Sequence, residues 1–431
     1  MPETNLLVTG DLHLGIHPSK IPEDLDSEDY SPGAVWQRMV QEACRRSVDA
    51  VMITGDIVDR ENQFFEAWGP FESGLAKLSE EAIPVFLVAG NHDAGVLESF
   101  VDSMDRDNVT LLGAGGEWER SVLRRDGEPV LHVDGWSYPD MSVRENPLND
   151  YDLSDPDTPV AGLLHTDLGT TGTTYAPVDQ EDLEQAVPDG WFLGHIHKPR
   201  LYSDQPLILN PGAPQPLNPT ETGVHGPWLV TVQSSGTMKA RQLPLANLEY
   251  AQVELDVSEL RNTGALAGEL KRTLEDRLEG RIPVNEHLDL ISVRARLTGR
   301  TELYRALDDE EADIKEALRF RVRGADAYVD VLDNQTRPEL DLDELSGGSG
   351  PVAVLARLLL SLEQEDESEL PDELLTTARN TMNEAYNAST YEPLRTHGDV
   401  DPPDRREAIS VIERQARSLL DTLVAQKEDS S

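Results

Sequence analysis

Residues 84–93 read PVFLVAGNHD, an apolar run that stops at a glycine and is followed by three polar side chains. Asn91, His92 and Asp93 could each bind a metal, transfer a proton or shape a turn. Short, nearly continuous apolar runs are typical of buried strands in a parallel sheet. Four more such runs end in polar residues: LLVTGDLHLG (6–15), AVMITGDIVDR (50–60), VAGLLHTDLG (160–169) and GWFLGHIHKP (190–199).

Helical segments separate the first three runs. Residues 33–48 and 64–82 carry apolar side chains at helical spacing. Strands that alternate with helices predict a layered α/β domain in which both faces of a sheet are covered. Because ligands of such domains bind at the carboxyl ends of the strands, the polar residues at these ends mark the expected functional site.

The sequence pattern changes after about residue 243. YAQVELDVSEL, HLDLISVRARLTG and ADAYVDVL alternate like half-exposed strands, with helical stretches at 263–280 and 301–320 between them. SGGSG has the composition of a flexible joint, and the helix expected at 402–427 carries an apolar stripe from Ile409 to Leu423. We predict an α/β domain at 1–243, a small α+β capping domain at 244–345, a linker at 346–350 and a helical partner-binding segment at 351–431.

The chain is strongly acidic, with 81 acidic and 37 basic residues and a formal net charge of -44. The acidic residues are spread over the whole length, which indicates a surface adapted to a salt-rich cytoplasm. Such a charge argues against nucleic acid as a partner, because binding phosphates normally needs a basic surface. At ~1 M salt, however, the Debye length is roughly 3 Å, so the charge does not exclude DNA.

Two other features limit the class of protein. Cys44 is the single cysteine, so neither a disulfide framework nor a thiolate zinc cage is expected. No apolar window approaches the length of a membrane span, and no basic leader precedes the first strand. We therefore expect a cytoplasmic protein with no membrane partner.

The polar residues at the strand ends include seven candidate metal ligands. Oxygen and imidazole donors without sulfur suit manganese, iron or zinc. Seven ligands are too many for one ion and fit two ions if one carboxylate bridges them. The candidates are Asp11, His13, Asp56, Asn91, His165, His195 and His197.

The order of these motifs, D-x-H, GD, GNHD, H and GHxH, resembles the calcineurin-like metallophosphoesterase superfamily. The resemblance implies a metallophosphoesterase β-sandwich flanked by helices, followed by a small α+β capping domain and a helical C-terminal segment. It also implies a ligand set for each of two divalent ions. Asp11, His13 and His197 would hold one ion and Asn91, His165 and His195 the other, with Asp56 bridging.

The resemblance extends to the DNA-repair exonuclease branch, the SbcD-type nuclease subunits, and most closely to their YhaO-like group. It rests on TGDLHLG, TGDIVDR, YAPVDQEDLEQAVPDGWFLGHIHKPRLY and NPGAPQPLNPTETGVHGPWLV, and it covers residues 5 to about 232. Archaeal and eukaryal relatives place a histidine three residues after the bridging aspartate, where this chain has Asp59. Their cleavage polarity is therefore not transferred.

The resemblance implies a two-metal exonuclease or endonuclease of DNA repair, most readily with Mn(2+). Within GNHD, His92 would supply a proton to the leaving oxygen, and Asp93 would orient its imidazole. DNA and an SMC-like coiled-coil ATPase are the expected partners, with a homodimer left open. Four side chains beside the metal motifs are candidate DNA contacts: Arg60, Tyr175, Lys198 and Arg200.

Two other functions stay open at this point. One is a phosphomonoesterase or nucleotide phosphodiesterase that uses the same metals. The other is a protein that tethers DNA ends, although the complete ligand set disfavours tethering as the only role.

Salt should control the folded state of this chain. Self-repulsion of a charge of -44 opposes compaction unless ions screen it. We expect circular dichroism and activity to reach their full values only at roughly molar KCl or NaCl, where screening is nearly complete. A chain that is folded and active at low salt and loses activity as salt rises would contradict the prediction.

Overall fold

The computed structural model describes residues 3–59, 64–104, 106–170, 172–279, 285–364, 370–387 and 404–428. By its contacts the chain divides into two compact units. The first consists of Met1–Glu254, Leu266–Arg296 and Ala312–Asp333, and the second of Leu255–Ala265, Leu297–Glu311 and Asn334–Ser431. This division does not follow the boundaries expected at 243, 345 and 350, which stay predictions.

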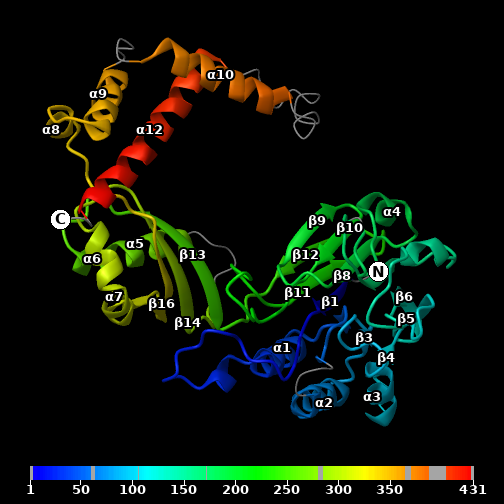
Figure 1. Cartoon of the computed structure of the whole chain (residues 1–431). Helices are drawn as coiled ribbons and strands as arrows, with labels where there is room; N and C mark the ends of the chain where they lie inside the picture. The colour runs from blue at the N-terminus through cyan, green and yellow to red at the C-terminus, as the bar shows by residue number, and fades with distance from the viewer. Residues whose placement is uncertain are drawn as a thin grey trace. The chain divides into compact units, whose positions relative to one another are not determined.

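The first sheet of the first unit has six strands. Its order is β12 (Met238–Gln242), β11 (Trp228–Val232), β1 (Thr4–Thr9), β2 (Ala50–Ile53), β3 (Val85–Leu87) and β4 (Val109–Leu111). Strands β1 to β4 run parallel, and β11 returns antiparallel to β1. The helices that connect the parallel strands are α1 (Pro32–Arg46), α2 (Phe64–Glu80) and α3 (Leu97–Met104) (Figure 1).

The second sheet also has six strands, four of them parallel. Its order is β5 (Glu119–Arg125), β6 (Glu128–Trp136), β7 (Val160–His165), β8 (Gly190–Gly194), β10 (Leu207–Asn210) and β9 (Arg200–Asp204). Strands β6, β7, β8 and β10 are parallel, and both edge strands are antiparallel. Helix α4 (Gln180–Gln185) precedes β8.

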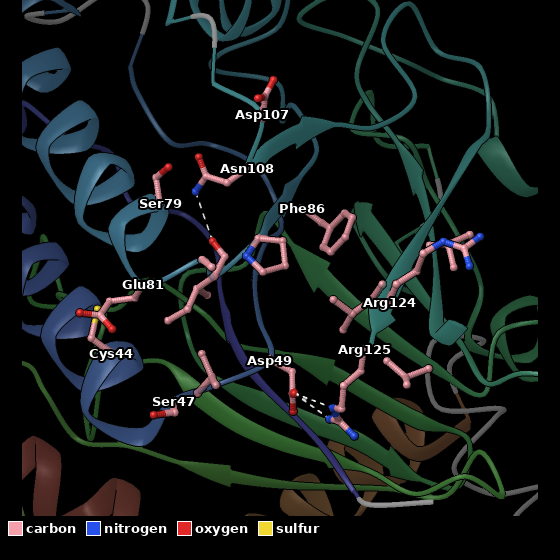
Figure 2. A pocket seen from close by; sticks show the side chains of 17 residues that line it. Cys44, Ser47, Asp49, Ser79, Glu81, Phe86, Asp107, Asn108, Arg124 and Arg125 are labelled. Atoms are coloured by element: carbon pink, nitrogen blue, oxygen red, sulfur yellow. Dashed lines mark hydrogen bonds and ion pairs between the residues drawn. The ribbon is translucent and has the colours of Figure 1, made fainter. Parts of the chain in front are cut away.

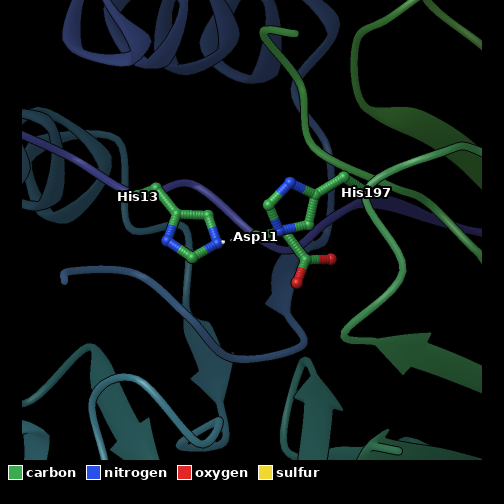
Figure 3. Close-up of side chains that lie close together, drawn as sticks. All are labelled: Asp11, His13 and His197. Carbon is green, nitrogen blue, oxygen red and sulfur yellow. Dashed lines mark hydrogen bonds between the residues drawn. The ribbon is translucent and has the colours of Figure 1, made fainter. Parts of the chain in front are cut away.

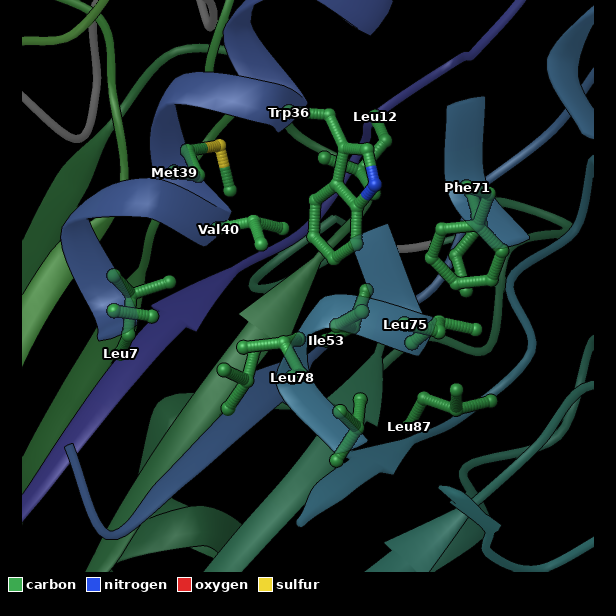
Figure 4. Packing of buried hydrophobic residues seen from close by; sticks show 14 of the residues in the cluster. Leu7, Leu12, Trp36, Met39, Val40, Ile53, Phe71, Leu75, Leu78 and Leu87 are labelled. Atoms are coloured by element: carbon green, nitrogen blue, oxygen red, sulfur yellow. The ribbon is translucent and has the colours of Figure 1, made fainter. Parts of the chain in front are cut away.

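The alternation of side chains along each strand explains the layers. On β1, Leu6 and Val8 pack into a core shared with Leu163 and Phe192 of the second sheet. Leu7 points to the opposite face and packs with residues of α1 and α2 (Figure 4). Each fully buried leucine stabilises the fold by about 1.5 to 3 kcal/mol. The predicted layered α/β fold, a sandwich flanked by helices, is confirmed.

A third sheet follows in the chain. Its order is β13 (Leu248–Asp256), β14 (Leu290–Thr298), β16 (Ala325–Asn334) and β15 (Arg319–Val322). The helices in this region are α5 (Leu266–Leu278), α6 (Tyr304–Asp309) and α7 (Glu311–Ala317). The predicted helix at 301–320 is thus two short helices separated at Glu310, whose φ of -108° and ψ of 15° depart from helical geometry.

The C-terminal segment is helical, as predicted. It contains α8 (Leu342–Ser346), α9 (Pro351–Glu363), α10 (Asp372–Asn387) and α12 (Arg405–Glu428). Ile412, Ala416 and Leu420 of the predicted stripe are buried in one cluster with Leu359 of α9 and Leu375 of α10. These three positions of the stripe are therefore covered by helices of the same segment, whereas Leu419 of the stripe is exposed. Among the described residues, no helix combines the length and the apolar character that crossing a membrane requires.

Adjacent leucines of α12 test this packing. Leu420 is 0% exposed and Leu419 is 51% exposed. Leu420→Ala should lower the free energy of unfolding of the helical segment by about 2 to 5 kcal/mol, because a buried side chain is lost and a cavity remains. Leu419→Ala is the matched control and should change it by about 0.5 kcal/mol or less. Hydrogen exchange of α9 and α12 measures both, and equal effects of the two variants would contradict the packing.

Candidate metal centre

The predicted ligands lie where the two sheets of the sandwich end. Four of them follow strands of the first sheet: Asp11 and His13 follow β1, Asp56 follows β2, and Asn91 follows β3. The other three belong to the second sheet, because His165 ends β7 while His195 and His197 follow β8. Contacts between these side chains bring the two sets together at the carboxyl ends of the parallel strands.

The backbone at this place is unusual. Asp11, His13, Asp56 and His195 have φ values of 48°, 45°, 51° and 92°. Left-handed conformations are uncommon for residues with a side chain, and they cluster at functional sites. The loops therefore hold these four side chains in directions that an extended strand could not give them.

Glycines make room for the ligands. A Cβ on Gly90 would lie 2.2 Å from Oδ1 of Asp56. A Cβ on Gly55, which has a φ of 98°, would lie 2.7 Å from the backbone nitrogen of Gly90 and 2.8 Å from Nδ1 of His165. The glycines of the GD and GNHD motifs thus let two strand-end loops approach each other around Asp56.

One group of donors consists of Asp11, His13 and His197 (Figure 3). Nε2 of His13 and Nε2 of His197 lie 3.1 Å apart. Oδ1 of Asp11 accepts the backbone N–H of His195 at 2.9 Å, while its buried Oδ2 has no hydrogen-bond partner. A buried carboxylate oxygen without a partner is costly unless a cation neutralises it.

A second group forms around Asp56. Its Oδ2 lies 3.2 Å from Nε2 of His165 and 3.9 Å from Nε2 of His13. Oδ1 of Asn91 lies 3.0 Å from Nε2 of His165 and 3.2 Å from Nδ1 of His195. Asp56 therefore contacts histidines of both expected ligand sets, which is the position that a bridging carboxylate requires.

The hydrogen bond of His165 fixes its tautomer. Its Nδ1 lies 2.9 Å from the carbonyl oxygen of Thr54, which can only accept, so Nδ1 carries a proton. Nε2 is then the nitrogen that faces Asp56 and Asn91. Metal-binding histidines are commonly held in this way by a partner behind the ring.

Burial and charge shift the pKa values of the four histidines in opposite directions. Burial lowers the pKa of His13 to about 4, and burial with the nearby charge of His165 lowers that of His195 to about 4. Burial also opposes the protonation of His165 and His197. The carboxylate of Asp56 nevertheless raises the pKa of His165 to about 9, and the hydrogen bond with Glu221 raises that of His197 to about 8.

The carboxylates show the same competition. Burial raises the pKa of Asp11. Burial acts in the same sense on Asp56, but the charges of His165 and His13 outweigh it and hold the pKa of Asp56 below its usual range. Acidic and imidazole donors that converge without sulfur fit hard or borderline divalent cations.

Comparisons with known proteins show which families the chain is similar to. Residues 4–199 match the calcineurin-like phosphoesterase family. Residues 250–337 match the middle domain of metallophosphoesterase YhaO. The chain is 27% identical over 390 residues to the uncharacterized metallophosphoesterase YhaO of Bacillus subtilis, covering 87% of this chain and 90% of that protein.

The chain also has a distant similarity to solved structures. A dimetal phosphatase from Danio rerio is 13% identical, with a TM-score of 0.34, covering 56% of this chain and 96% of that one. The calcineurin-like phosphoesterase YfkN from Bacillus subtilis is 12% identical, with a TM-score of 0.32, covering 56% of this chain and 88% of that one. The similarity of residues 4–199 to calcineurin-like phosphoesterases and the convergent Asp and His donors are features expected of a metal-dependent phosphoester hydrolase.

The structure corrects the role expected for Asp93. Both of its oxygens accept backbone N–H groups, Oδ1 from Gly90 and Oδ2 from Ile57, each at 2.7 Å. Asp93 therefore ties the loop after β3 to the loop after β2, and it does not orient His92. The carboxylate beside His92 is that of Asp59, whose Oδ2 lies 3.7 Å from Nδ1 of the imidazole.

His92 itself lies at the edge of the centre. Its side chain is 44% exposed, and its ring centroid lies 5.1 Å from that of His13. Its backbone N–H donates to Oδ1 of Asp56 at 2.9 Å. His92 is thus fixed beside the expected ligands with its ring open to solvent, as a group that meets substrate must be.

The four residues expected to contact DNA differ in their exposure to solvent and in the side chains that they contact. The ring of Tyr175 is 38% exposed and lies 4.6 Å from the ring of His195. Lys198 and Arg200 are exposed just beyond His197, and the guanidinium of Arg200 stacks over the ring of Tyr202 at 4.6 Å. Arg60 lies outside the described residues.

Glu221 contacts one of the expected ligands and was not singled out by the sequence analysis. Its Oε1 lies 2.9 Å from Nδ1 of His197. No spacing rule marks it, because 24 residues separate it from that histidine. It lies in the stretch NPGAPQPLNPTETGVHGPWLV. Nothing in that stretch indicates that its glutamate contacts His197.

A cavity of about 640 Å³ lies away from this centre. It is lined by residues such as Asp49 and Pro84, which precede β2 and β3, and by Arg125, which pairs with Asp49 at 2.7 Å (Figure 2). It is therefore at the amino ends of the strands, whereas the expected ligands follow the carboxyl ends. The cavity is therefore not a candidate for the catalytic site, although its volume is large.

Substitutions at neighbouring positions should separate ligand from proton donor. Asn91→Ala removes an oxygen donor, so the metal content should fall from two ions towards one per chain. His92→Ala leaves all seven expected ligands in place. It should keep both ions while slowing cleavage by about 10²- to 10⁴-fold, the usual worth of general acid catalysis.

Mass spectrometry of the metal content and single-turnover cleavage measure these effects. Loss of an ion in His92→Ala, or a rate close to that of the parent protein, would show that His92 does not have this role.

Proposed function

We propose that the chain is a metallophosphoesterase that hydrolyses the phosphodiester bond of DNA, an SbcD-type nuclease of DNA repair that uses Mn(2+). The observation that carries the proposal is the position of His92 outside the expected ligand set, exposed at its edge. The leaving group of a phosphodiester is a sugar oxygen, which leaves poorly without a proton. A placed imidazole supplies that proton.

Under this proposal, different residues bind the metal ions, donate the proton and contact the DNA phosphates. The seven expected donors would hold two divalent ions, and such ions stabilise charge on phosphoryl oxygens and make bound water more acidic. Asp59 faces Nδ1 of His92, which leaves Nε2 to donate its proton to the leaving oxygen. Lys198 and Arg200 are exposed where they would contact phosphates beside the scissile bond.

The acidic composition is compatible with this substrate. Beyond a few ångströms, roughly molar salt screens the repulsion between DNA and a chain of charge -44. Binding would then depend on groups at contact distance. Salt should therefore weaken DNA binding less steeply here than it does for a basic DNA-binding protein.

The partner ATPase remains a prediction. The resemblance implies it, and the apolar stripe from Ile409 to Leu423 supported a partner-binding role for residues 351–431. Ile412, Ala416 and Leu420 are buried within the helical segment itself, so that reason no longer applies. Exposed apolar residues of the segment include Val354, Leu374 and Leu419, and the proposed nuclease function does not depend on them.

A cleavage assay tests the substrate. Single- and double-stranded DNA labelled at either end should be cleaved by the full chain in high salt, most strongly with Mn(2+) when Mn(2+), Mg(2+) and Zn(2+) are compared. Asp56→Ala, which removes the expected bridging carboxylate, should abolish cleavage.

Parallel assays with p-nitrophenyl phosphate and a nucleotide phosphodiester complete the design. Hydrolysis of these small esters with no cleavage of DNA would replace the proposal with a phosphomonoesterase or nucleotide phosphodiesterase. Binding of DNA ends without hydrolysis of any substrate would replace it with a tethering role.

A further inference from the structure

Glu221 is a buried carboxylate directly behind one of the expected metal ligands. It is 5% exposed. Its Oε1 lies 2.9 Å from Nδ1 of His197 and also accepts the side-chain amide of Asn218. Its Oε2 accepts the backbone N–H of Leu217 at 2.6 Å. Both oxygens therefore have defined partners, and one partner is the imidazole.

We propose that Glu221 is the positioning residue of the metal centre, acting through His197. A carboxylate accepts hydrogen bonds, so its contact keeps the proton of the neutral imidazole on Nδ1. Nε2 then presents its lone pair towards Asp11 and His13, with which His197 forms one donor group. A carboxylate behind a histidine also makes the ring a stronger ligand.

The geometry on the far side of His197 shows why the tautomer matters. Nε2 of His197 lies 3.1 Å from Nε2 of His13. Two ring nitrogens that approach this closely cannot both carry a proton, and a cation between them needs both lone pairs. Because Glu221 holds the proton of His197 on Nδ1, the lone pair of Nε2 is free to bind a cation.

In the donor group that contains His165, a hydrogen-bond acceptor also lies behind the imidazole, but it is a weaker one. Nδ1 of His165 donates to the carbonyl oxygen of Thr54 at 2.9 Å. That acceptor is a neutral backbone group, whereas the acceptor behind His197 is a charged side chain that substitution can remove. Changing Glu221 should therefore affect the group that contains His197 and spare the group that contains His165.

Glu221 is itself held firmly in place. Its backbone N–H donates to the carbonyl oxygen of Asn218 at 3.0 Å, which closes a turn around the carboxylate. The next residue, Thr222, forms an isolated β-bridge with Tyr250 of β13. The carboxylate is therefore fixed by the backbone on either side of it, and its direction towards His197 does not depend on the metal.

The pattern of acceptors explains why glutamate is required at this position. Glutamine has one acceptor oxygen, and its amide NH₂ would face either His197 or the backbone N–H of Leu217. Aspartate keeps two acceptor oxygens but is shorter by one methylene, so it cannot reach both partners equally well. Aspartate should therefore preserve part of the effect, and glutamine less of it.

Metal titration of the full chain tests the proposal without any substrate, so its outcome does not depend on the proposed nuclease function. Calorimetry and native mass spectrometry with Mn(2+) in high salt should show two ions bound by the parent protein. Glu221→Gln should weaken one of them by about 10- to 100-fold and leave the other unchanged, which is the usual effect of removing an outer partner of a metal-binding histidine. The affinity of Glu221→Asp for the weakened ion should lie between that of the parent protein and that of Glu221→Gln.

A second buried glutamate provides the control. Glu249 is also 5% exposed but lies on β13. Glu249→Gln should leave both ions at parent affinity, which separates loss of positioning from the general cost of changing a buried carboxylate. Thermal unfolding of the metal-free variants checks that each is folded. Parent affinity for both ions in Glu221→Gln, or equal weakening of both ions in a folded variant, would overturn the proposal.

Discussion

The arrangement of the metal centre depends on one buried carboxylate, that of Asp56. It contacts His165 and His13, and it accepts the backbone N–H of His92. Space for it exists only because residue 90 is a glycine, since a Cβ there would lie 2.2 Å from its Oδ1. Moving this carboxylate would therefore displace expected ligands from both sheets together with His92.

Much of this centre could be predicted from the sequence, because its ligands follow apolar runs that were recognisable as buried strands. The parallel order of β1, β2 and β3 brings Asp11, Asp56 and Asn91 to the same edge without any other information. The layers were predictable for the same reason, since nearly continuous apolar strands must be covered on both faces.

The sequence was less informative where side chains meet through the tertiary fold. Asp93 was assigned to His92 because the two are adjacent in the chain, yet adjacent residues in a tight turn point in different directions. The backbone N–H groups of Gly90 and Ile57 needed an acceptor there. The partners of His92 and His197, Asp59 and Glu221, come from other loops, and no periodicity reports such contacts. The apolar stripe of α12 was recognised, but the surface that covers it was not predictable.

The division of the ligands between the two sheets has a mechanical consequence. Each expected ion takes donors from both: Asp11 and His13 face His197 across the sandwich, and Asn91 faces His165 and His195. Any sliding of one sheet over the other would change the distances between these donors. The apolar layer between the sheets, which includes Val8 and Phe192, therefore sets the spacing of the expected metal donors as well as the stability of the domain. A substitution deep in that layer could alter metal selectivity without touching a ligand.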